Sequence, residues 1–417
     1  MAAGNLPKIV IAGCGFGGMA AALDLHGLLK DKAKILAIDK TDRFDYHASL
    51  PELVSGKISR DSISIPYESL FSRLGIEFLQ AKISKVDWKK KLVLTDKGKV
   101  KYDYLVLAVG SQTNFYDIPG AKEHCFEFKI DLDAIAIREH VTKMFESCSL
   151  SEKDDGSTRI VVVGGGLTGV ELVTDLKDLL DKVCARCNIP DEKREIVLVG
   201  RSEHLNPGFS AEVSDFIESY LRKQGIALVL GNPVKKVEKD CVVLSDGKKI
   251  IAKTIIWCAG IKPASVAEQF GSKGFNSQCG LVLNKYLQCI ADPTVFAVGD
   301  CGYCSAFEVQ PVLTALRAIE QSDYACHNLC CEINGNRKHK MQYVPRYFPA
   351  FISLGRGMGV LSFHGIWLKG RRIAWLKKIS EKIHLARFRH NWSFLEYFDA
   401  LMVSVLEFYY FMIVRRR

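Results

Sequence analysis

The stretch KIVIAGCGFGGMAAALDL occupies residues 8–25 and is the most specific indication of the fold. Its apolar run IVIA predicts a buried strand, and its Ala-rich end predicts a helix. Between them stand Gly13, Gly15 and Gly18. In this spacing the first glycine permits a tight turn, the second lets the backbone approach a pyrophosphate, and the third lets helix and strand pack closely. The helix amino terminus then offers unpaired N–H groups to an anion, so the stretch predicts a dinucleotide-binding unit.

The next apolar segment, AKILAID, supports this interpretation because it ends in Asp39, about twenty residues further on. An acid at this point accepts a hydrogen bond from a ribose hydroxyl. Strand, glycine loop, helix, strand and acid together are far more specific than the glycines alone. We therefore expect Phe16, Gly17 and Lys40, which adjoin the loop and the acid, to line the same site.

A second unit follows in RIVVVGGGLTGVELVTDL, residues 159–176. Its glycines are Gly164, Gly166 and Gly169, and Leu167 and Thr168 complete the loop. Two such units in one chain predict two dinucleotides. A hydride donor and a flavin are the natural pair, because a flavin accepts a hydride and can release its electrons singly.

Two further segments, YDYLVLAVGS and TVFAVGDCG, predict strands that end in small residues. Ligands of parallel sheets lie at the carboxyl ends of the strands. Small residues there allow close approach of the backbone, and an acid could accept a hydrogen bond from a ribityl hydroxyl. The residues at these two ends are Ala108, Val109, Gly110, Gly299 and Asp300.

Length and composition fit a globular protein of two or three domains, with 417 residues, 48% hydrophobic and 25% charged. We expect an α/β fold of two Rossmann-like doubly wound domains. A flavin domain would comprise residues 1–154 and 281–336, a nucleotide domain residues 155–280, and a C-terminal region residues 337–417. The amino terminus has neither a signal peptide nor a transit peptide pattern, which favours a cytosolic start.

The fourteen cysteines favour reduced thiols in a reducing compartment. Two CxxC pairs, Cys184/Cys187 and Cys301/Cys304, would suit a zinc or redox site. Their spacing alone is weak support, and a structural role is the stronger expectation.

The positive charge gathers at the carboxyl end, where residues 337–417 hold sixteen Lys and Arg against four Asp and Glu. A nucleic-acid enzyme would more often spread this charge over a groove, so an anionic membrane surface is the better partner. Residues 366–393 show helical apolar spacing, and we expect a basic amphipathic helix. The cations on its polar face would be Lys377, Lys378, Lys382, Arg387 and Arg389. Residues 394–414 are long enough to span a bilayer, but three acids favour a helix in the interface. The alternative use of these apolar residues is a homodimer surface.

Seen together, these segments resemble the type II NADH:quinone oxidoreductases, two-dinucleotide flavoproteins of the pyridine nucleotide-disulfide oxidoreductase superfamily. The resemblance covers nearly the whole chain. It implies oxidation of NADH on FAD, reduction of a quinone without proton pumping, no required metal, and a peripheral place on the cytoplasmic face of the cell membrane. It rests on the segments RFDYHASLPELVSGKIS, LVLAVGSQTNFYDIPG, FEFKIDLDAIAIREHV, GGGLTGVEL, IIWCAGIKP, VFAVGDC and ISLGRGMGVL.

The resemblance also implies roles for single residues. Glu171 of TGVE would lie between nicotinamide and flavin and relay protons, and Lys129 of FEFK would support the flavin, although it could be only a surface cation. Ala259 and Gly260 of WCAGIKP would line the nucleotide site. On the quinone side we expect Thr314, Ala315, Leu316, Glu320 and Phe348.

Several of these positions depart from the family. Leu316 and Glu320 stand where the family places two glutamines, and Phe348 aligns with a lysine. Gly200 replaces the acid that follows the second ribose-binding strand, with Arg201 next to it. Arginine can bind a 2′-phosphate that an acid would repel, so we expect the protein to accept NADPH as well as NADH. Alternatively, Arg201 faces solvent and Ser202 or Glu203 takes the ribose.

Relatives with other chemistry are less favoured. Residues 41–60 contain no cysteine, which excludes the redox pair of the disulfide reductases. A sulfide:quinone oxidoreductase would need cysteines near the flavin, for which Cys125, Cys148, Cys301 and Cys304 are the candidates. The remaining alternatives are a non-quinone acceptor, motivated by the lost glutamines, and a redox sensor with negligible turnover.

Overall fold

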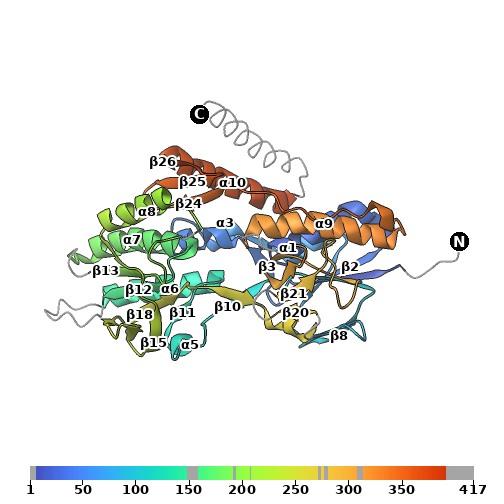
Figure 1. The fold of residues 1–417 in the computed structure, drawn as a ribbon, viewed down its shortest axis with the longest axis horizontal. Helices are drawn as coiled ribbons and strands as arrows, with labels where there is room; N and C mark the ends of the chain where they lie inside the picture. Colours follow the sequence, from blue (N-terminus) through green and yellow to red (C-terminus); the bar gives the residue numbers. More distant parts are fainter. Residues whose placement is uncertain are drawn as a thin grey trace.

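The computed structural model describes residues 6–147, 158–190, 194–206, 208–270, 274–276, 280–307 and 313–390. Two lobes lie side by side, each built on a five-stranded parallel sheet, and a third layer lies across both (Figure 1). The inner strands of both sheets are apolar runs whose side chains are almost entirely buried, as expected for parallel sheets covered on both faces.

The first sheet has the strand order β22-β9-β1-β2-β5, with every pair parallel. Because β22 follows the strands of the second sheet in sequence, the first sheet is assembled from two separate segments of the chain. Helices α1 and α9 pack against each other beside this sheet, and an antiparallel meander, β6-β7-β8, adjoins it. The bounds are β1 (Lys8–Ala12), α1 (Phe16–Leu29), β2 (Lys34–Asp39), β5 (Glu77–Gln80), β6 (Ile83–Asp87), β7 (Leu92–Thr95), β8 (Gly98–Lys101), β9 (Tyr104–Leu107), β22 (Val295–Ala297) and α9 (Ala315–Ile333).

The second sheet has the order β11-β18-β12-β13-β14, again all parallel. Its first strand precedes residue 154, so the second sheet includes a segment that the predicted boundary assigns to the first domain. The bounds are β11 (Phe126–Glu127), α6 (Asp131–Glu146), β12 (Arg159–Val163), α7 (Leu167–Cys187), β13 (Glu195–Val199), α8 (Ala211–Lys223), β14 (Ile226–Val229), β15 (Val234–Glu238), β16 (Cys241–Leu244), β17 (Lys249–Ile251) and β18 (Thr254–Trp257).

Shorter elements join the lobes. The antiparallel pair β10 (Ser111–Thr113) and β19 (Ile261–Pro263) connects them, since each strand directly follows a strand of a different large sheet. The other short elements are β3 (Arg43–Asp45), α2 (Leu50–Val54), α3 (Arg60–Ile63), β4 (Ser64–Pro66), α4 (Tyr67–Arg73), α5 (Ala121–His124), β20 (Phe275–Asn276), β21 (Gly280–Leu283) and β23 (Gly302–Cys304).

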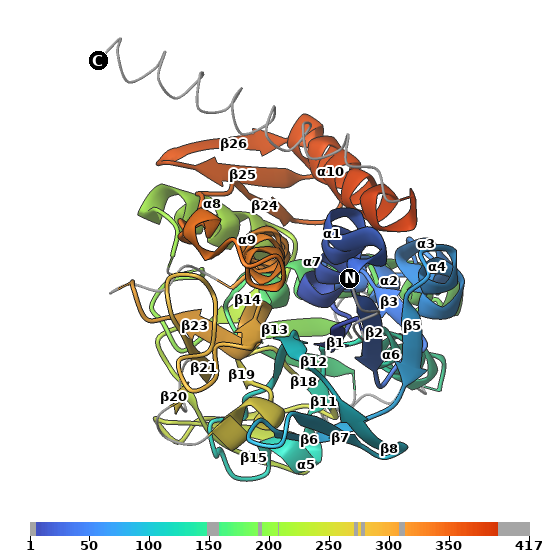
Figure 2. The same cartoon turned by 90° about the vertical axis from the view of Figure 1, so that its right-hand side faces the viewer.

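The third layer is formed by β24 (Ala350–Ser353), β25 (Gly359–Phe363), β26 (Ile366–Gly370) and α10 (Arg371–His390). Figure 2 shows it stacked above α1, α8 and α9. The sequence predicts one helix over residues 366–393, but residues 366–370 pair as a strand with β25. The predicted span of residues 394–414 lies outside the described residues. Within the described ranges, no helix is both long and apolar enough to cross a bilayer.

The predicted polar face of α10 is also partly wrong. The side chains of Lys377 and Arg387 are only 15% and 10% exposed. Both turn toward the protein because carboxylates lie opposite them, Glu171 beside Lys377 and Asp24 beside Arg387. Lys378, in contrast, is 54% exposed, and Lys382 is exposed as well.

Candidate active site

The two glycine loops have the same geometry. Gly13 and Gly164 both have positive φ, +93° and +130°, and a Cβ on either would lie 2.5 Å from the backbone of a neighbouring strand end, at Ala108 or Cys258. A Cβ on Gly18 would lie 1.9 Å from the oxygen of Gly13, and Gly169 repeats this contact with Gly164. These four positions therefore require glycine for the turn and for close helix–strand packing.

Gly15 and Gly166 differ from these four because a Cβ on either would meet nothing within 4 Å. Each residue is the N-cap of a long helix, α1 or α7, at the carboxyl end of its sheet. The open space thus faces unpaired helix N–H groups, which suits a pyrophosphate. The residues present fit one dinucleotide in each lobe.

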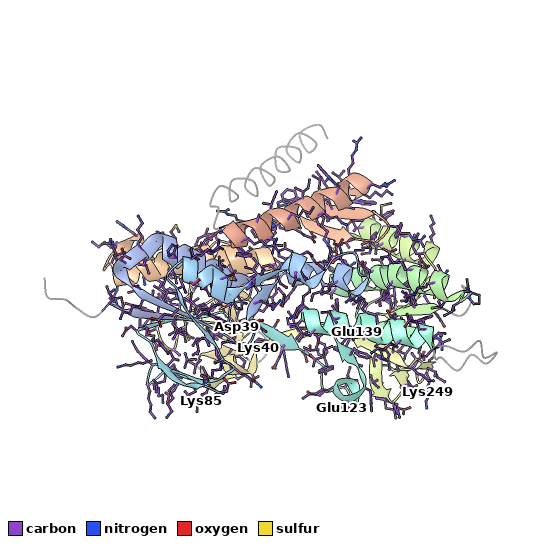
Figure 3. The ribbon with its side chains drawn as sticks, turned by 180° about the vertical axis from the view of Figure 1, so that it is seen from behind. Asp39, Lys40, Lys85, Glu123, Glu139 and Lys249 are labelled. Atoms are coloured by element: carbon purple, nitrogen blue, oxygen red, sulfur yellow. The ribbon has the colours of Figure 1, made fainter. Side chains whose placement is uncertain are left out.

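Asp39 is fixed at the end of β2. Its Oδ2 accepts a hydrogen bond from Cys14 N at 2.7 Å, and its Oδ1 accepts one from Thr41 N at 2.9 Å. The carboxylate therefore adjoins the first loop. Figure 3 shows Asp39 and the exposed Lys40 on the side of the first lobe that faces the second.

The structure brings Lys129 and Asp300 together. Lys129 Nζ donates to Ser111 Oγ at 2.6 Å, and Ser111 Oγ donates to Asp300 Oδ2 at 2.7 Å. Burial and the charge of Lys40 lower the pKa of Lys129, while Asp300 opposes this shift. Lys129 is therefore part of a polar chain at the strand ends. Ser111 was not singled out in the sequence, although it ends the segment LAVGS.

The other residues of the first site line the same loops. Phe16 packs edge-on against the rings of Phe44 and Tyr46, at 5.1 and 5.2 Å between centroids. Gly17 is buried, and a Cβ there would lie 2.8 Å from the side chain of Val298. Gly110 and Gly299 have positive φ, and Val109 connects Gly110 to Ala108. Gly299 N donates to Gln321 Oε1 at 2.7 Å, a helix contact that the sequence did not predict.

In the second lobe, Leu167 and the exposed Thr168 lie in the first turn of α7. Ala259 and Gly260 follow β18, and a Cβ on Gly260 would lie 2.2 Å from the hydroxyl of Tyr116.

The residue at the end of the ribose-binding strand differs between the lobes: the first lobe has Asp39, and the second has Gly200. A Cβ on Gly200 would lie 2.8 Å from Leu230 Cδ2, so an acid there would require Leu230 to move. Arg201 is exposed, and the carboxylate of Glu203 lies against Gly231.

Glu171 lies on α7 with its side chain 12% exposed. Its Oε1 accepts hydrogen bonds from Ser353 N at 2.7 Å and from Lys377 Nζ at 2.5 Å. The lysine that contacts this acid thus comes from α10. Sequence periodicity missed it because a helical pattern does not tell a lipid-facing lysine from one that faces a carboxylate.

The expected quinone-side residues are brought together around Arg317. Glu320 is 5% exposed and accepts hydrogen bonds from Arg317 Nη1 at 2.6 Å, Tyr343 OH at 3.1 Å and Arg346 N at 2.8 Å. The Arg317 guanidinium lies 5.2 Å from the ring centroid of Phe348. The carboxylate of Glu320 is therefore engaged within the protein.

The start of α9 completes this side. Thr314 caps the helix, accepting a hydrogen bond from Arg317 N at 3.1 Å. Ala315 and Leu316 are half-buried in its first turn.

The candidate redox cysteines are in unfavourable surroundings for a thiolate. Burial raises the pKa of both Cys125 and Cys301 to about 12. Cys301 Sγ donates to Leu107 O at 3.3 Å, while Cys148 lies outside the described residues. Within those residues, no group of three or more His, Cys, Asp or Glu side chains is arranged to hold a metal ion.

Comparison with known proteins agrees with this geometry. The pattern of the pyridine nucleotide-disulphide oxidoreductase family matches residues 7–322. A type II NADH:quinone oxidoreductase of Staphylococcus epidermidis is 30% identical over 380 residues, which covers 89% of this chain and 93% of the relative.

Two solved structures share the fold. An NDH2 from Plasmodium falciparum in complex with NADH superposes with a TM-score of 0.81 and 20% identity, covering 92% of this chain and 98% of that one. A sulfide:quinone oxidoreductase from Aquifex aeolicus gives 0.77 and 22%, covering 92% of both chains. From the family match, the bacterial relative and the two matching loops, this chain belongs to the pyridine nucleotide-disulphide oxidoreductases and, within them, to the type II NADH:quinone oxidoreductase family of enzymes.

Proposed function

We propose that this enzyme oxidises NADH with a bound flavin and passes the electrons to a quinone. The observation that carries the proposal is the pair of equivalent glycine loops, each of which opens a helix beside free space at the carboxyl end of a parallel sheet. The relative from Staphylococcus epidermidis carries this activity in its name. Steady-state oxidation of NADH that requires both flavin and added quinone would test it, and turnover without either would contradict it.

The protein's own part in the reaction is to bind, orient and exclude water. When bound, the flavin supplies the transfer from a hydride donor to the acceptor. Gly15 and Gly166 leave room for the two pyrophosphates, and Asp39 offers an acceptor to a ribose. Glu171 would face the nicotinamide with a charge balanced by Lys377. Holding the two ring systems in contact supplies much of the rate enhancement.

We infer that the flavin is FAD. FMN has no adenosine ribose, whereas Asp39 stands where an adenosine ribose needs an acceptor, beside a loop shaped for a pyrophosphate. Chromatography of the flavin released by denaturation would identify it, and FMN would contradict the inference.

We infer that NADPH is also accepted, since Gly200 and the exposed Arg201 replace the usual acid. R201A should raise the dissociation constant of NADPH roughly tenfold to a hundredfold, because one charge-assisted hydrogen bond contributes about 1.5–3 kcal/mol. The constant for NADH should hardly change. The matched control is R222A, because Arg222 is also an exposed arginine but lies away from the loop, on α8. An equal effect of R201A on both nucleotides would show that Arg201 does not recognise the 2′-phosphate.

A second candidate function, with a non-quinone acceptor, is favoured by one observation. Glu320, at a position where the family has glutamine, is already bonded to three donors of the protein. Reoxidation of the reduced enzyme by soluble acceptors but by no quinone in detergent or lipid would favour this alternative.

We propose that the C-terminal region attaches the enzyme to the cytoplasmic face of a membrane. Trp375 is 63% exposed on α10, close to the exposed Lys378 and Lys382. Aromatic and basic side chains together suit an anionic headgroup layer. Flotation with anionic vesicles, but not with neutral ones at moderate salt, is the expected result. A homodimer of the intact protein that floats with neither would favour the alternative use of this surface.

A further inference from the structure

Five charged side chains form a cluster beneath α10, which we call the α10 charge cluster. It comprises Glu52 of α2, Glu171 of α7, and Lys377, Lys378 and Glu381 of α10. The cluster therefore joins the first lobe, the second lobe and the third layer, which Figure 1 shows crossing both. Its three carboxylates outnumber its two ammonium groups.

The distances show which charges are shared. Lys377 Nζ lies 2.5 Å from Glu171 Oε1 and 3.5 Å from Glu381 Oε1. Both carboxylate side chains are at least 85% buried, with 12% of Glu171 and 15% of Glu381 exposed. On its other side Glu381 Oε2 accepts a long hydrogen bond, 3.5 Å, from Ser49 Oγ. Lys378 is directed to Glu52, at 3.2 Å. One ammonium thus serves two buried carboxylates.

We propose that Glu381 is a positioning residue for Glu171: the two carboxylates share the Lys377 ammonium, and the charge on Glu381 sets how much of that ammonium remains available to Glu171. With Glu381 neutral, Lys377 pairs with Glu171 alone. With Glu381 ionised, the pair becomes a triad that carries an excess negative charge. The proposal rests on the proposed function only in placing Glu171 beside the nicotinamide.

The titration of the cluster supports this arrangement. The pKa of Glu381 is raised to about 7, mainly by burial and also by the charges of Glu171 and Glu52, while Lys377 opposes this shift. Burial disfavours the charge on Lys377, but Glu171 and Glu381 outweigh burial and raise its pKa. Lys377 therefore stays charged while Glu381 changes charge near neutral pH. The groups that face Glu381 are Glu171, Glu52, Lys377 and the hydroxyl of Ser49.

A stability measurement tests the titration without any cofactor chemistry. A carboxyl whose pKa is higher in the folded state holds its proton more tightly there, so the stability it contributes is lost as pH rises from the unfolded pKa, 4.5, through about 7. Glutamine cannot ionise, so E381Q should lack this loss. E381Q should match the wild type near about pH 5 and show a higher Tm at about pH 8.

Two further variants sharpen this measurement. K382Q, at an exposed lysine next to Glu381, is the matched control and should follow the wild-type profile. E171Q removes a neighbouring negative charge and should move the pH window downward. Parallel Tm profiles of wild type and E381Q would overturn the proposal, as would an unshifted window in E171Q.

A kinetic measurement tests the link to Glu171. The rate of flavin reduction by NADH should change with pH near neutrality in the wild type. In E381Q the rate should stay at the low-pH wild-type value up to about pH 8.5, and E381D should restore the change. An inflection that persists in E381Q would overturn the proposal. A wild-type enzyme that NADH does not reduce at any pH would instead contradict the proposed function, and the Tm profiles would still decide the role of Glu381.

Discussion

Lys129 reaches Asp300 through the hydroxyl of Ser111, at the ends of two strands of the first sheet. K129Q should loosen the flavin roughly tenfold to a hundredfold, because charge-assisted hydrogen bonds contribute about 1.5–3 kcal/mol each. Flavin fluorescence on dilution measures the release. K122Q, at an exposed lysine of α5, is the control. Equal flavin retention in both variants would show that Lys129 is only a surface cation.

Among single residues, the sequence predicts those whose role depends on neighbours in the sequence. The turns at Gly13 and Gly164 follow from spacing alone, because a tight turn and a close helix leave no room for a side chain. Lys377 could not be found in this way. Lys377 is 206 residues from Glu171 in the sequence, and the hydrogen bond between them depends on how α10 packs across both lobes. Ser111 was missed for a related reason, since its role depends on Asp300, a partner from a distant segment.

At the scale of elements, two glycines near the start of α1 have different roles, one in flavin binding and the other in stability. G15A should fold normally and bind flavin poorly, because its methyl group would enter the open space where a pyrophosphate fits. G18A should lower the free energy of unfolding by about 3 kcal/mol, because its Cβ would lie 1.9 Å from a backbone oxygen and would push the helix off the strand.

The same helix offers a control for both variants. A Cβ on Gly27 would meet nothing within 4 Å, so G27A should keep its flavin. Because alanine favours the helix more than glycine does, its free energy of unfolding should rise by up to about 1 kcal/mol. Thermal unfolding and flavin content of the three proteins check these outcomes. Equal destabilisation by G15A and G18A would contradict the assigned roles of the two glycines.

The elements that the sequence predicts poorly are in the third layer. Both parallel sheets follow from apolar runs and glycine loops, whereas β26 was expected to be helical. Residues 366–370 mix apolar and basic side chains, so their pattern fits either element. These residues form a strand because they pair with β25, and helical periodicity in the sequence cannot reveal such a tertiary contact.

At the scale of the whole molecule, Lys57 links the two lobes. It follows α2 of the first lobe, and its Nζ lies 2.8 Å from Asp175 Oδ1 and 2.5 Å from Asp178 Oδ2, both on α7 of the second lobe. K57M should cost about 3 kcal/mol, because it leaves the fully buried Asp175 without its cation.

The pH dependence of K57M identifies the cause. Burial raises the pKa of Asp175, and Lys57 opposes that shift. Without Lys57 the pKa rises further, so stability is lost more steeply as pH increases above the unfolded value. The loss of unfolding free energy in K57M, relative to the wild type, should be small near about pH 4 and should reach its full size near about pH 7. K85M, at an exposed lysine of β6 labelled in Figure 3, should show no such deficit. A deficit of constant size at all pH values would point to lost packing.

In the proposed function, electrons pass from one dinucleotide site to the other and then to a quinone. Anaerobic rapid mixing follows both steps: the flavin-loaded enzyme is mixed with NADH or NADPH while flavin absorbance is followed, and a quinone is then added. We expect fast bleaching by at least one nucleotide, followed by full recovery of the absorbance with quinone. Flavin that neither nucleotide bleaches would contradict the assignment of the second loop, and bleached flavin that no quinone reoxidises would contradict the assignment of the acceptor.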